Sequence, residues 1–309
     1  MENNEKAVLS ESILKLLEQK ILIIDGATGT MLQEKGLSSG ECPEMWNITH
    51  PDTVLEIHNS YLEAGADIIL TNTFGANGVK LKKLKLESKL IEANEQAVKL
   101  ARQAVDEYKK KDLRPVFVAG SIGPTGEILV PCGPLGIDEA YKGYQEQVKA
   151  MVATGVDMIL LETFYNLDEI KIALKAVKEN SDLIVFASMT FDESLKTIYG
   201  ITPEKAVEEL FQDEADGVGA NCGSGPELLY KILTRMRIIT DAPLLVEPNA
   251  GVPYIENNKV IYPALPEKMA KYAEKFAQLK VNIIGGCCGT TPKHIQAISE
   301  KIKNMNKNN

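Results

Sequence analysis

The sequence predicts an α/β fold, a (β/α)8 TIM-type barrel with an extra N-terminal helix. Short apolar runs alternate with amphipathic stretches of helical period along the whole chain, which is the pattern of repeated βαβ units around a parallel sheet. The apolar runs number about eight, as many as close a barrel. Because no linker rich in Gly, Pro or Ser divides the 309 residues, we expect one domain over 1–309 with an ordered core over about 12–303. An open doubly wound sheet is the alternative.

The elements follow in chain order. The extra helix, about Ser10–Lys20, precedes the first strand and is expected to plug or flank the bottom of the barrel. The expected strands are Ile21–Asp25, Ile68–Asn72, Val116–Gly120, Met158–Glu162, Ile184–Met189, Gly217–Asn221, Leu244–Glu247 and Asn282–Gly285. The expected helices are Thr53–Ala64, Ser88–Lys109, Glu139–Thr154, Leu167–Glu179, Pro203–Phe211, Pro226–Ile239, Glu267–Leu279 and Lys293–Ile302. The polar tail after the last helix is expected to fray.

Composition and charge exclude several classes of function. The net charge is −9, and no Lys/Arg cluster is interleaved with aromatic residues, which argues against nucleic-acid binding. No uncharged apolar run approaches 18 residues and no signal peptide precedes the first helix, so we expect a cytoplasmic protein without membrane contact. Five cysteines are an odd number, which disfavours a disulfide framework and raises metal binding or catalysis as their use.

Three of the cysteines lie where a barrel enzyme carries its active site, at the carboxyl ends of strands. Cys222 follows the sixth strand, and Cys287 and Cys288 follow the eighth. One strand separates these two, so at about 4.8 Å per strand their ends lie roughly 10 Å apart and their side chains can meet at one ion. Cys42 and Cys132 do not follow a predicted strand and are interpreted as small core residues without a role in metal binding.

Adjacent strand residues point to opposite faces, so Cys287 and Cys288 can share a metal only if the backbone turns sharply. The neighbouring glycines Gly285, Gly286 and Gly289 permit that turn. Burial as small core side chains is the alternative for these cysteines. Three thiolates without an equally strong fourth protein ligand leave an open position, as in catalytic zinc sites. Such a site suits activation of a substrate thiol and therefore alkyl transfer to sulfur.

Seven motifs together resemble the homocysteine S-methyltransferases, and most closely the homocysteine-binding module of cobalamin-dependent methionine synthase. The resemblance covers about residues 12–303, and the Asn-Cys and Gly-Gly-Cys-Cys-Gly elements are its most specific parts. The motifs are DGATGT (Asp25–Thr30), TNTFGAN (Thr71–Asn77), GSIGPTGE (Gly120–Glu127), LLETF (Leu160–Phe164), GANCGSGPE (Gly219–Glu227), VEPNAGVP (Val246–Pro253) and GGCCGTTPKHI (Gly285–Ile295).

The resemblance implies a zinc ion held by Cys222, Cys287 and Cys288, with the homocysteine sulfur as the fourth ligand. It also implies that Glu162 and the loop around Asp25 hold the amino acid end of homocysteine. Glu162 can pair with the substrate ammonium, and N–H groups of a Gly-rich loop can receive its carboxylate. Asp25 could equally satisfy loop amides. The expected substrate-binding residues are Asp25, Gly26, Ala27, Thr28, Thr73, Glu162 and Asn249.

Asn249 follows the strand between those that supply the cysteines. Its carbonyl oxygen is a weak neutral ligand that could complete the zinc site before homocysteine arrives and then yield to the stronger thiolate. The alternative is that Asn249 only caps the loop after Pro248.

The resulting functional hypothesis is zinc-dependent methyl transfer to homocysteine, giving methionine. The preferred donor is methylcobalamin on a separate corrinoid protein. The length leaves no room for folate, cobalamin or reactivation domains, so the donor stays open at this point. A methyltetrahydrofolate:corrinoid methyltransferase is then a possible partner. Alternatives are S-methylmethionine, S-adenosylmethionine or betaine as donor, another thiol acceptor, or a non-catalytic subunit that presents homocysteine. A Rossmann-type nucleotide site is disfavoured, since no G-x-G-x-x-G follows the first strand.

Overall fold

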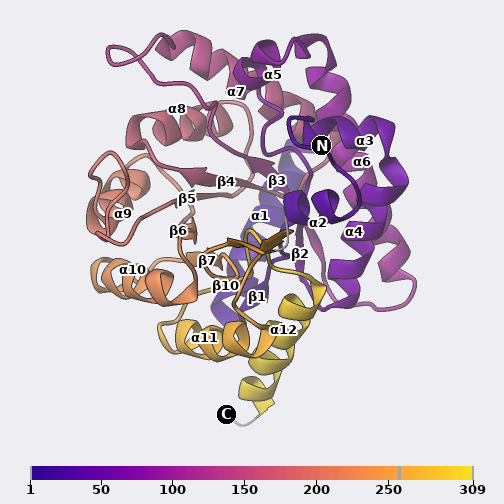
Figure 1. Ribbon diagram of the computed structural model, residues 1–309, viewed down its shortest axis with the longest axis vertical. Helices are drawn as coiled ribbons and strands as arrows, with labels where there is room; N and C mark the ends of the chain where they lie inside the picture. Colours follow the sequence, from indigo (N-terminus) through magenta and orange to yellow (C-terminus); the bar gives the residue numbers. More distant parts are fainter. Residues whose placement is uncertain (1, 257–258, 308–309) are drawn as a thin grey trace.

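Eight parallel strands form the centre of the protein and close on themselves (Figure 1). The computed structural model describes residues 2–256 and 259–307. The neighbours run in the order β1-β10-β7-β6-β5-β4-β3-β2, and a parallel bridge between Ile24 and Ile68 joins the two ends. The predicted (β/α)8 barrel is therefore confirmed. The strands are β1 (Leu22–Ile23), β2 (Ile68–Leu70), β3 (Phe117–Ile122), β4 (Met158–Phe164), β5 (Val185–Met189), β6 (Gly217–Cys222), β7 (Leu244–Pro248) and β10 (Ile283–Ile284).

Helices surround the barrel, and each of the eight predicted helices has a counterpart. Among the described residues, no helix has the length and apolar content needed to cross a bilayer. The helices are α1 (Glu2–Gln19), α2 (Thr28–Glu34), α3 (Trp46–Thr49), α4 (Pro51–Glu63), α5 (Gly78–Lys83), α6 (Leu90–Lys109), α7 (Ile137–Thr154), α8 (Leu167–Lys178), α9 (Pro203–Gln212), α10 (Pro226–Ile239), α11 (Pro266–Gln278) and α12 (Pro292–Lys307).

The structure differs from the sequence prediction in its short elements and at its ends. Helices α2, α3 and α5 and an antiparallel hairpin, β8 (Tyr254–Glu256) with β9 (Lys259–Ile261), were not predicted. Each is too short for hydrophobic periodicity to reveal it. The expected frayed tail is wrong for residues 303–307, because α12 continues through them and Met305 packs against the core.

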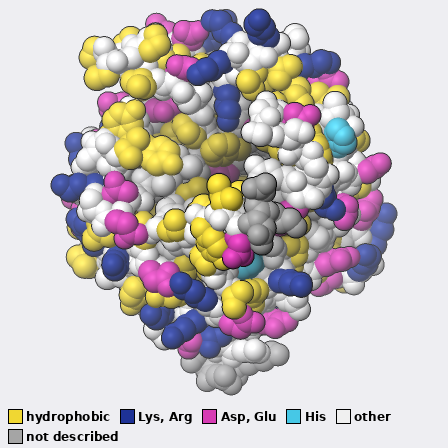
Figure 2. Space-filling model, in the orientation of Figure 1, with side chains coloured by type: hydrophobic (Ala, Val, Ile, Leu, Met, Phe, Trp, Pro, Cys, Tyr) yellow, Lys and Arg dark blue, Asp and Glu magenta, His cyan; other side chains and the backbone are white. Residues whose placement is uncertain are grey.

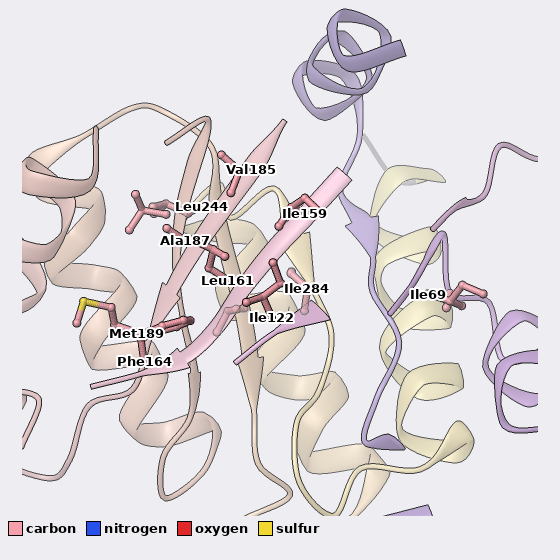
Figure 3. Close-up of a cluster of buried hydrophobic side chains, with 14 of the residues drawn as sticks. Ile69, Ile122, Ile159, Leu161, Phe164, Val185, Ala187, Met189, Leu244 and Ile284 are labelled. Atoms are coloured by element: carbon pink, nitrogen blue, oxygen red, sulfur yellow. The ribbon is translucent and has the colours of Figure 1, made fainter. Parts of the chain in front are cut away.

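Strand residues alternate between two hydrophobic clusters, as the pleat of a strand requires. One cluster fills the barrel interior and includes Leu22, Phe117 and Leu160. The other lies between the strands and the outer helices, and Figure 3 shows part of it, with Ile159 and Leu161 of β4 labelled. Neighbouring residues on one strand thus serve different layers, and the alternation identifies which positions face inward.

Helix α1 closes the bottom of the barrel. Ile13 and Leu17 are buried and belong to the same cluster as the inward strand residues. At the amino ends of two strands, Ser10 Oγ donates to the Asp182 carbonyl at 3.2 Å and Asn282 Nδ2 donates to the Leu17 carbonyl at 3.1 Å. The predicted N-terminal helix is confirmed, and it acts as a plug.

Inward positions near the carboxyl ends of the strands are polar instead of apolar. The alternation that places Met158 and Leu160 inside continues to Glu162. The same alternation of inward and outward residues along the other strands places a polar layer above the apolar interior. Its members are Ser121, Glu162, Ser188, Asn221 and Glu247, all buried. Helix α1 therefore seals the apolar end of the barrel, and the polar end faces the mouth.

The plug can be tested with Leu17→Ala, which removes a side chain that is 3% exposed. We expect the free energy of unfolding to fall by about 2–5 kcal/mol, the usual cost of a Leu→Ala cavity. The measurement is urea denaturation, with the exposed Glu18→Ala as the control on the same helix. A loss of less than about 0.5 kcal/mol in Leu17→Ala, within the range of surface changes, would contradict the plug.

Candidate metal centre and active site

The three strand-end cysteines meet in space. The sulfur atoms of Cys222, Cys287 and Cys288 all lie within 4.8 Å of one another, and the Sγ atoms of Cys222 and Cys287 are 2.9 Å apart. Cys42 and Cys132 lie elsewhere: Cys42 donates to Glu44 Oε2 at 2.9 Å, and Cys132 is exposed. The spacing of the strand ends predicted this division of the five cysteines.

Turns at the two strand ends bring the thiols together. After β10, the Thr290 N–H donates to the Cys287 carbonyl at 3.1 Å, and Gly289 adopts a φ of 78°. A Cβ on Gly289 would stand 2.0 Å from the Tyr262 ring, so only glycine fits there. At the end of β6, Cys222 itself has a φ of 60°, an uncommon conformation for a residue with a side chain. The backbone is thus bent at both ends to aim the sulfurs at one point.

The three thiols shift one another's pKa values. Hydrogen bonds donated by Cys222 and Cys287 lower the pKa of Cys288 to about 3, while donation to Cys222 and Cys288, together with burial, keeps the pKa of Cys287 well above its ordinary value. A divalent cation among the sulfurs would allow all three to ionise, because metal binding displaces thiol protons. Three convergent soft sulfur donors fit zinc, whose Zn–S bonds are about 2.3 Å long.

Three buried carboxyl groups lie in the barrel mouth with the cysteines, those of Asp25, Glu162 and Glu247. We call these three residues the acid cluster. Burial raises the pKa of Glu162 to about 7, and the charge of Cys288 adds to this, although a hydrogen bond from Ser121 opposes it. Burial also raises the pKa of Glu247, and the charges of Glu162 and Asp25 add to the shift.

The acid cluster lacks a cationic partner. No ion pair joins its members to a Lys, Arg or His among the described residues, and Asp25 Oδ1 and Glu247 Oε2 are buried without a hydrogen-bond partner there. Buried carboxylates need such a partner to remain ionised. The arrangement therefore suits a ligand that brings a positive charge.

The loop after β1 borders both the cysteines and the acid cluster. Asp25 Oδ2 accepts from the Leu70 N–H at 2.9 Å, and the Ala27 N–H donates to Thr290 Oγ1 at 3.1 Å. A Cβ on Gly26 would stand 2.7 Å from the same Thr290 oxygen. Thr28 begins α2, whose N-cap makes no side-chain hydrogen bond. Apart from Ala27, the first N–H groups of this loop and helix therefore have no side-chain acceptor in the part of the chain that the structure describes.

Two predicted substrate-binding side chains already have hydrogen bonds inside the protein. The Thr73 hydroxyl donates to the Ser121 carbonyl at 2.7 Å and lies 2.6 Å from Thr71 Oγ1, so its contact with homocysteine stays a prediction. Asn249 Nδ2 donates to the Gly223 carbonyl at 2.7 Å, and its Oδ1 is buried without a hydrogen-bond partner among the described residues.

Sequence reasoning did not assign four residues of this site. Glu247 stands inside the otherwise apolar run Leu244–Pro248, and that unexpected charge was the available signal. Ser121 donates to Glu162 Oε1, and Asn221 contacts Thr163 and Cys287. Tyr262 lowers the pKa of Cys288. Ser121 and Asn221 lie in strand-end motifs of the sequence, but their contacts, like the position of Tyr262, join distant segments and could not be predicted from it.

A parallel barrel with three convergent thiols and an acid cluster at its mouth has the arrangement of a barrel enzyme, whose active site lies at the carboxyl ends of the strands. Comparison with known proteins identifies the family. The family model described as homocysteine S-methyltransferase matches residues 22–302. The chain therefore belongs to the homocysteine S-methyltransferase family, whose enzymes methylate the sulfur of homocysteine.

Individual relatives share sequence or fold with this chain. The chain is 31% identical to the methionine synthase of Mycobacterium tuberculosis (strain ATCC 25618 / H37Rv) over 97% of its own length and 26% of that protein, so it spans about a quarter of this relative. The metallated form of the Escherichia coli homocysteine methyltransferase MmuM superposes with a TM-score of 0.79 at 24% identity, over 93% of this chain and 98% of MmuM. The apo form gives 0.73 at 25% identity, with the same coverage of both chains.

The ligand assignment predicts about one zinc ion per chain. Cys222→Ala, Cys287→Ala or Cys288→Ala should each abolish tight binding, because two thiolates cannot hold the ion against a chelator. The controls Cys42→Ala and Cys132→Ala should keep full stoichiometry. The measurement is metal analysis after dialysis against a chelator, and loss of zinc from either control would show that the ligands are misassigned.

The raised pKa of Glu162 predicts pH-dependent substrate binding. Below about pH 7 the carboxyl group is protonated and cannot pair with an ammonium, so homocysteine affinity should fall as pH drops through 7. Glu162→Gln should weaken homocysteine binding at pH 8 by about tenfold or more, in line with the loss of a charge-assisted hydrogen bond, and leave zinc content unchanged. Calorimetric titration checks both, and an unchanged affinity removes Glu162 from the site.

Proposed function

We propose that this protein catalyses zinc-dependent transfer of a methyl group to the sulfur of homocysteine, forming methionine. The observation that carries the proposal is the meeting of three thiols within 4.8 Å beside an acid cluster that lacks a cation. Zinc held by Cys222, Cys287 and Cys288 would lower the pKa of the homocysteine thiol and keep it as a nucleophilic thiolate near neutral pH.

The acid cluster would select the amino acid end of the substrate. An ammonium group placed between Glu162, Asp25 and Glu247 supplies the positive charge that these buried carboxyl groups lack, and a hydrogen-bond donor for the free oxygens of Asp25 and Glu247. The N–H groups at the start of α2 are free of a side-chain cap and would receive the carboxylate. Simple thiols without the amino acid group should then be poor acceptors, which favours homocysteine over other thiols.

Asn249 would occupy the remaining position at the metal in the absence of substrate. Its backbone N–H lies 3.4 Å from the Cys222 carbonyl, which ties it to the metal-binding loop. Because its Oδ1 has no other partner in the described part of the chain, that oxygen is available as a weak ligand. Homocysteine, as the softer and stronger donor, would displace it.

The reaction itself is a displacement at carbon. The homocysteine thiolate attacks the methyl carbon in line with the bond to the donor, a new S–C bond forms, and the donor leaves with the electron pair of the broken bond. The chain positions the thiolate by holding both ends of homocysteine, which supplies orientation to an otherwise bimolecular step.

The proposed donor is methylcobalamin carried by a separate corrinoid protein, which a methyltetrahydrofolate:corrinoid methyltransferase would recharge. The resemblance to the homocysteine-binding module of cobalamin-dependent methionine synthase supports this choice. The hairpin supports it too, since Tyr254, Ile255 and Val260 are 48%, 77% and 59% exposed. The base of the hairpin adjoins the site, because the Ala250 N–H donates to the Cys288 carbonyl. Figure 2 shows apolar side chains at the border of the hollow in the middle of this face of the protein. Exposed apolar surface of this kind commonly marks a protein contact.

A donor panel tests the proposal. With homocysteine and zinc present, we expect methionine from methylcobalamin and none after chelation, whereas activity with S-methylmethionine, S-adenosylmethionine or betaine alone would assign a different donor. No methionine from any donor, despite homocysteine binding, would favour a non-catalytic subunit that presents homocysteine.

The same assay tests the hairpin. Ile255→Ser should slow transfer from a corrinoid protein and leave transfer from free methylcobalamin unchanged, with the exposed Leu113→Ser, on the loop before β3, as the control. Equal rates with both donors would remove the hairpin from donor binding.

A further inference from the structure

Asn221 lies in the polar layer immediately before the metal-binding Cys222, and its side chain uses its full hydrogen-bonding capacity. Its Oδ1 accepts from the Thr163 N–H and from Ser188 Oγ, each at 2.8 Å. Its Nδ2 donates to Thr163 Oγ1 at 2.6 Å and is 4.0 Å from the sulfur of Cys287. An amide group has two donors and two acceptor sites, and each of them has a neighbour here.

These contacts determine the orientation of the amide. A backbone N–H can only donate, so the atom facing the Thr163 nitrogen must be Oδ1. The amide NH₂ group therefore has to point toward Thr163 Oγ1 and the Cys287 sulfur. The reverse orientation would place two donors against each other and an oxygen against a sulfur that is negatively charged in the metal-bound state.

Thr163 places a second hydrogen-bond donor near the sulfur of Cys222. Its Oγ1 accepts from Asn221, so its own proton is free, and this oxygen lies 4.0 Å from the sulfur of Cys222. Thr163 has a φ of 66° and sits where the register between β4 and β5 shifts. That irregularity turns Thr163 toward β6, and the hydrogen bond from its N–H to Asn221 holds the unusual conformation.

The same irregularity follows directly after Glu162. Asn221 thus connects three parts of the site: the β6 end that carries Cys222, the β10 end that carries Cys287, and the β4 end that carries Glu162. Each of these parts comes from a different strand. Along the chain, they are separated by whole βα units.

We propose that Asn221, acting together with Thr163, is a positioning residue that directs hydrogen-bond donors at the thiolates of Cys287 and Cys222 and aligns the metal centre with Glu162. The proposal rests on the proposed function only in that a metal ion occupies the three-cysteine site. Hydrogen bonds to metal-bound thiolates withdraw electron density from sulfur, and such outer contacts commonly change metal affinity by about 10- to 100-fold when removed.

The test uses the full-length protein loaded with Co²⁺ in place of zinc, because cobalt reports its thiolate ligands through a sulfur-to-metal charge-transfer absorption band. Asn221→Asp keeps the shape and the acceptor oxygen but replaces the donor NH₂ with oxygen, and Thr163→Val removes only the hydroxyl. Loss of the donors makes the sulfurs more electron-rich, so we expect the band to move to longer wavelength in both variants. Zinc affinity, measured by competition with a chelating dye, should fall by about 10- to 100-fold in Asn221→Asp.

The control is Thr190→Val. It removes a hydroxyl that donates to the backbone carbonyl of Asn221 at 3.2 Å and makes no hydrogen bond to the side-chain amide. It should leave the band and the zinc affinity unchanged. If Asn221→Asp fails to fold, Thr163→Val still tests the proposal, since it removes the hydroxyl but keeps the bonds that Asn221 Oδ1 accepts from the Thr163 N–H and from Ser188 Oγ. A native protein that binds no cobalt would overturn the proposed function. A native band that stays unchanged in Asn221→Asp and Thr163→Val would overturn this inference and leave the proposed function standing.

Discussion

The concentration of buried negative charge at the barrel mouth is the constraint on which the rest of this site depends. Three convergent thiols whose pKa values depend on one another and three carboxyl groups with raised pKa values occupy one layer. No protein cation neutralises them among the described residues. Ionisation of these groups therefore favours a bound positive charge, and a metal ion at the sulfurs and an ammonium at the carboxyl groups are the two charges that the arrangement accepts. Binding of either should stabilise the fold, because ligand and metal bind the native state.

The barrel can hold this charge because its two ends differ. The lower interior is apolar and sealed by α1, which supplies hydrophobic burial away from the mouth. The upper layer is polar and is held by side-chain contacts between strands, such as Ser121 with Glu162 and Ser188 with Asn221. Packing and chemistry are thereby separated along the barrel axis, as in other barrel enzymes.

Two of the six non-glycine residues with positive φ in the described part of the chain lie in the same layer. Thr163 and Cys222 both have positive φ values, although neither is glycine, and such residues cluster at functional sites when their surroundings enforce the conformation. Here the side-chain amide of Asn221 accepts from the Thr163 N–H, and Asn221 directly precedes Cys222 in the chain. The strain aims the Cys222 sulfur into the mouth, which an undistorted strand end would not do.

The sequence alone determined the barrel, the order of its strands and helices, the N-terminal plug and the three cysteines. These features depend on local periodicity and on the rule that parallel strand ends share one edge, and both can be read along the chain. Only the tertiary structure revealed the hairpin, the short helices and the continuation of α12, because a few residues carry no measurable period.

Only the tertiary structure, too, brought Glu247 into the acid cluster and gave Asn221 and Thr163 their contacts with the sulfurs. Those assignments depend on which face of each strand points inward and on irregularities such as the register shift in β4. Closure of the barrel decides the first, and hydrogen bonds between residues as distant as Thr163 and Asn221 decide the second, so neither is encoded in any single segment of the chain.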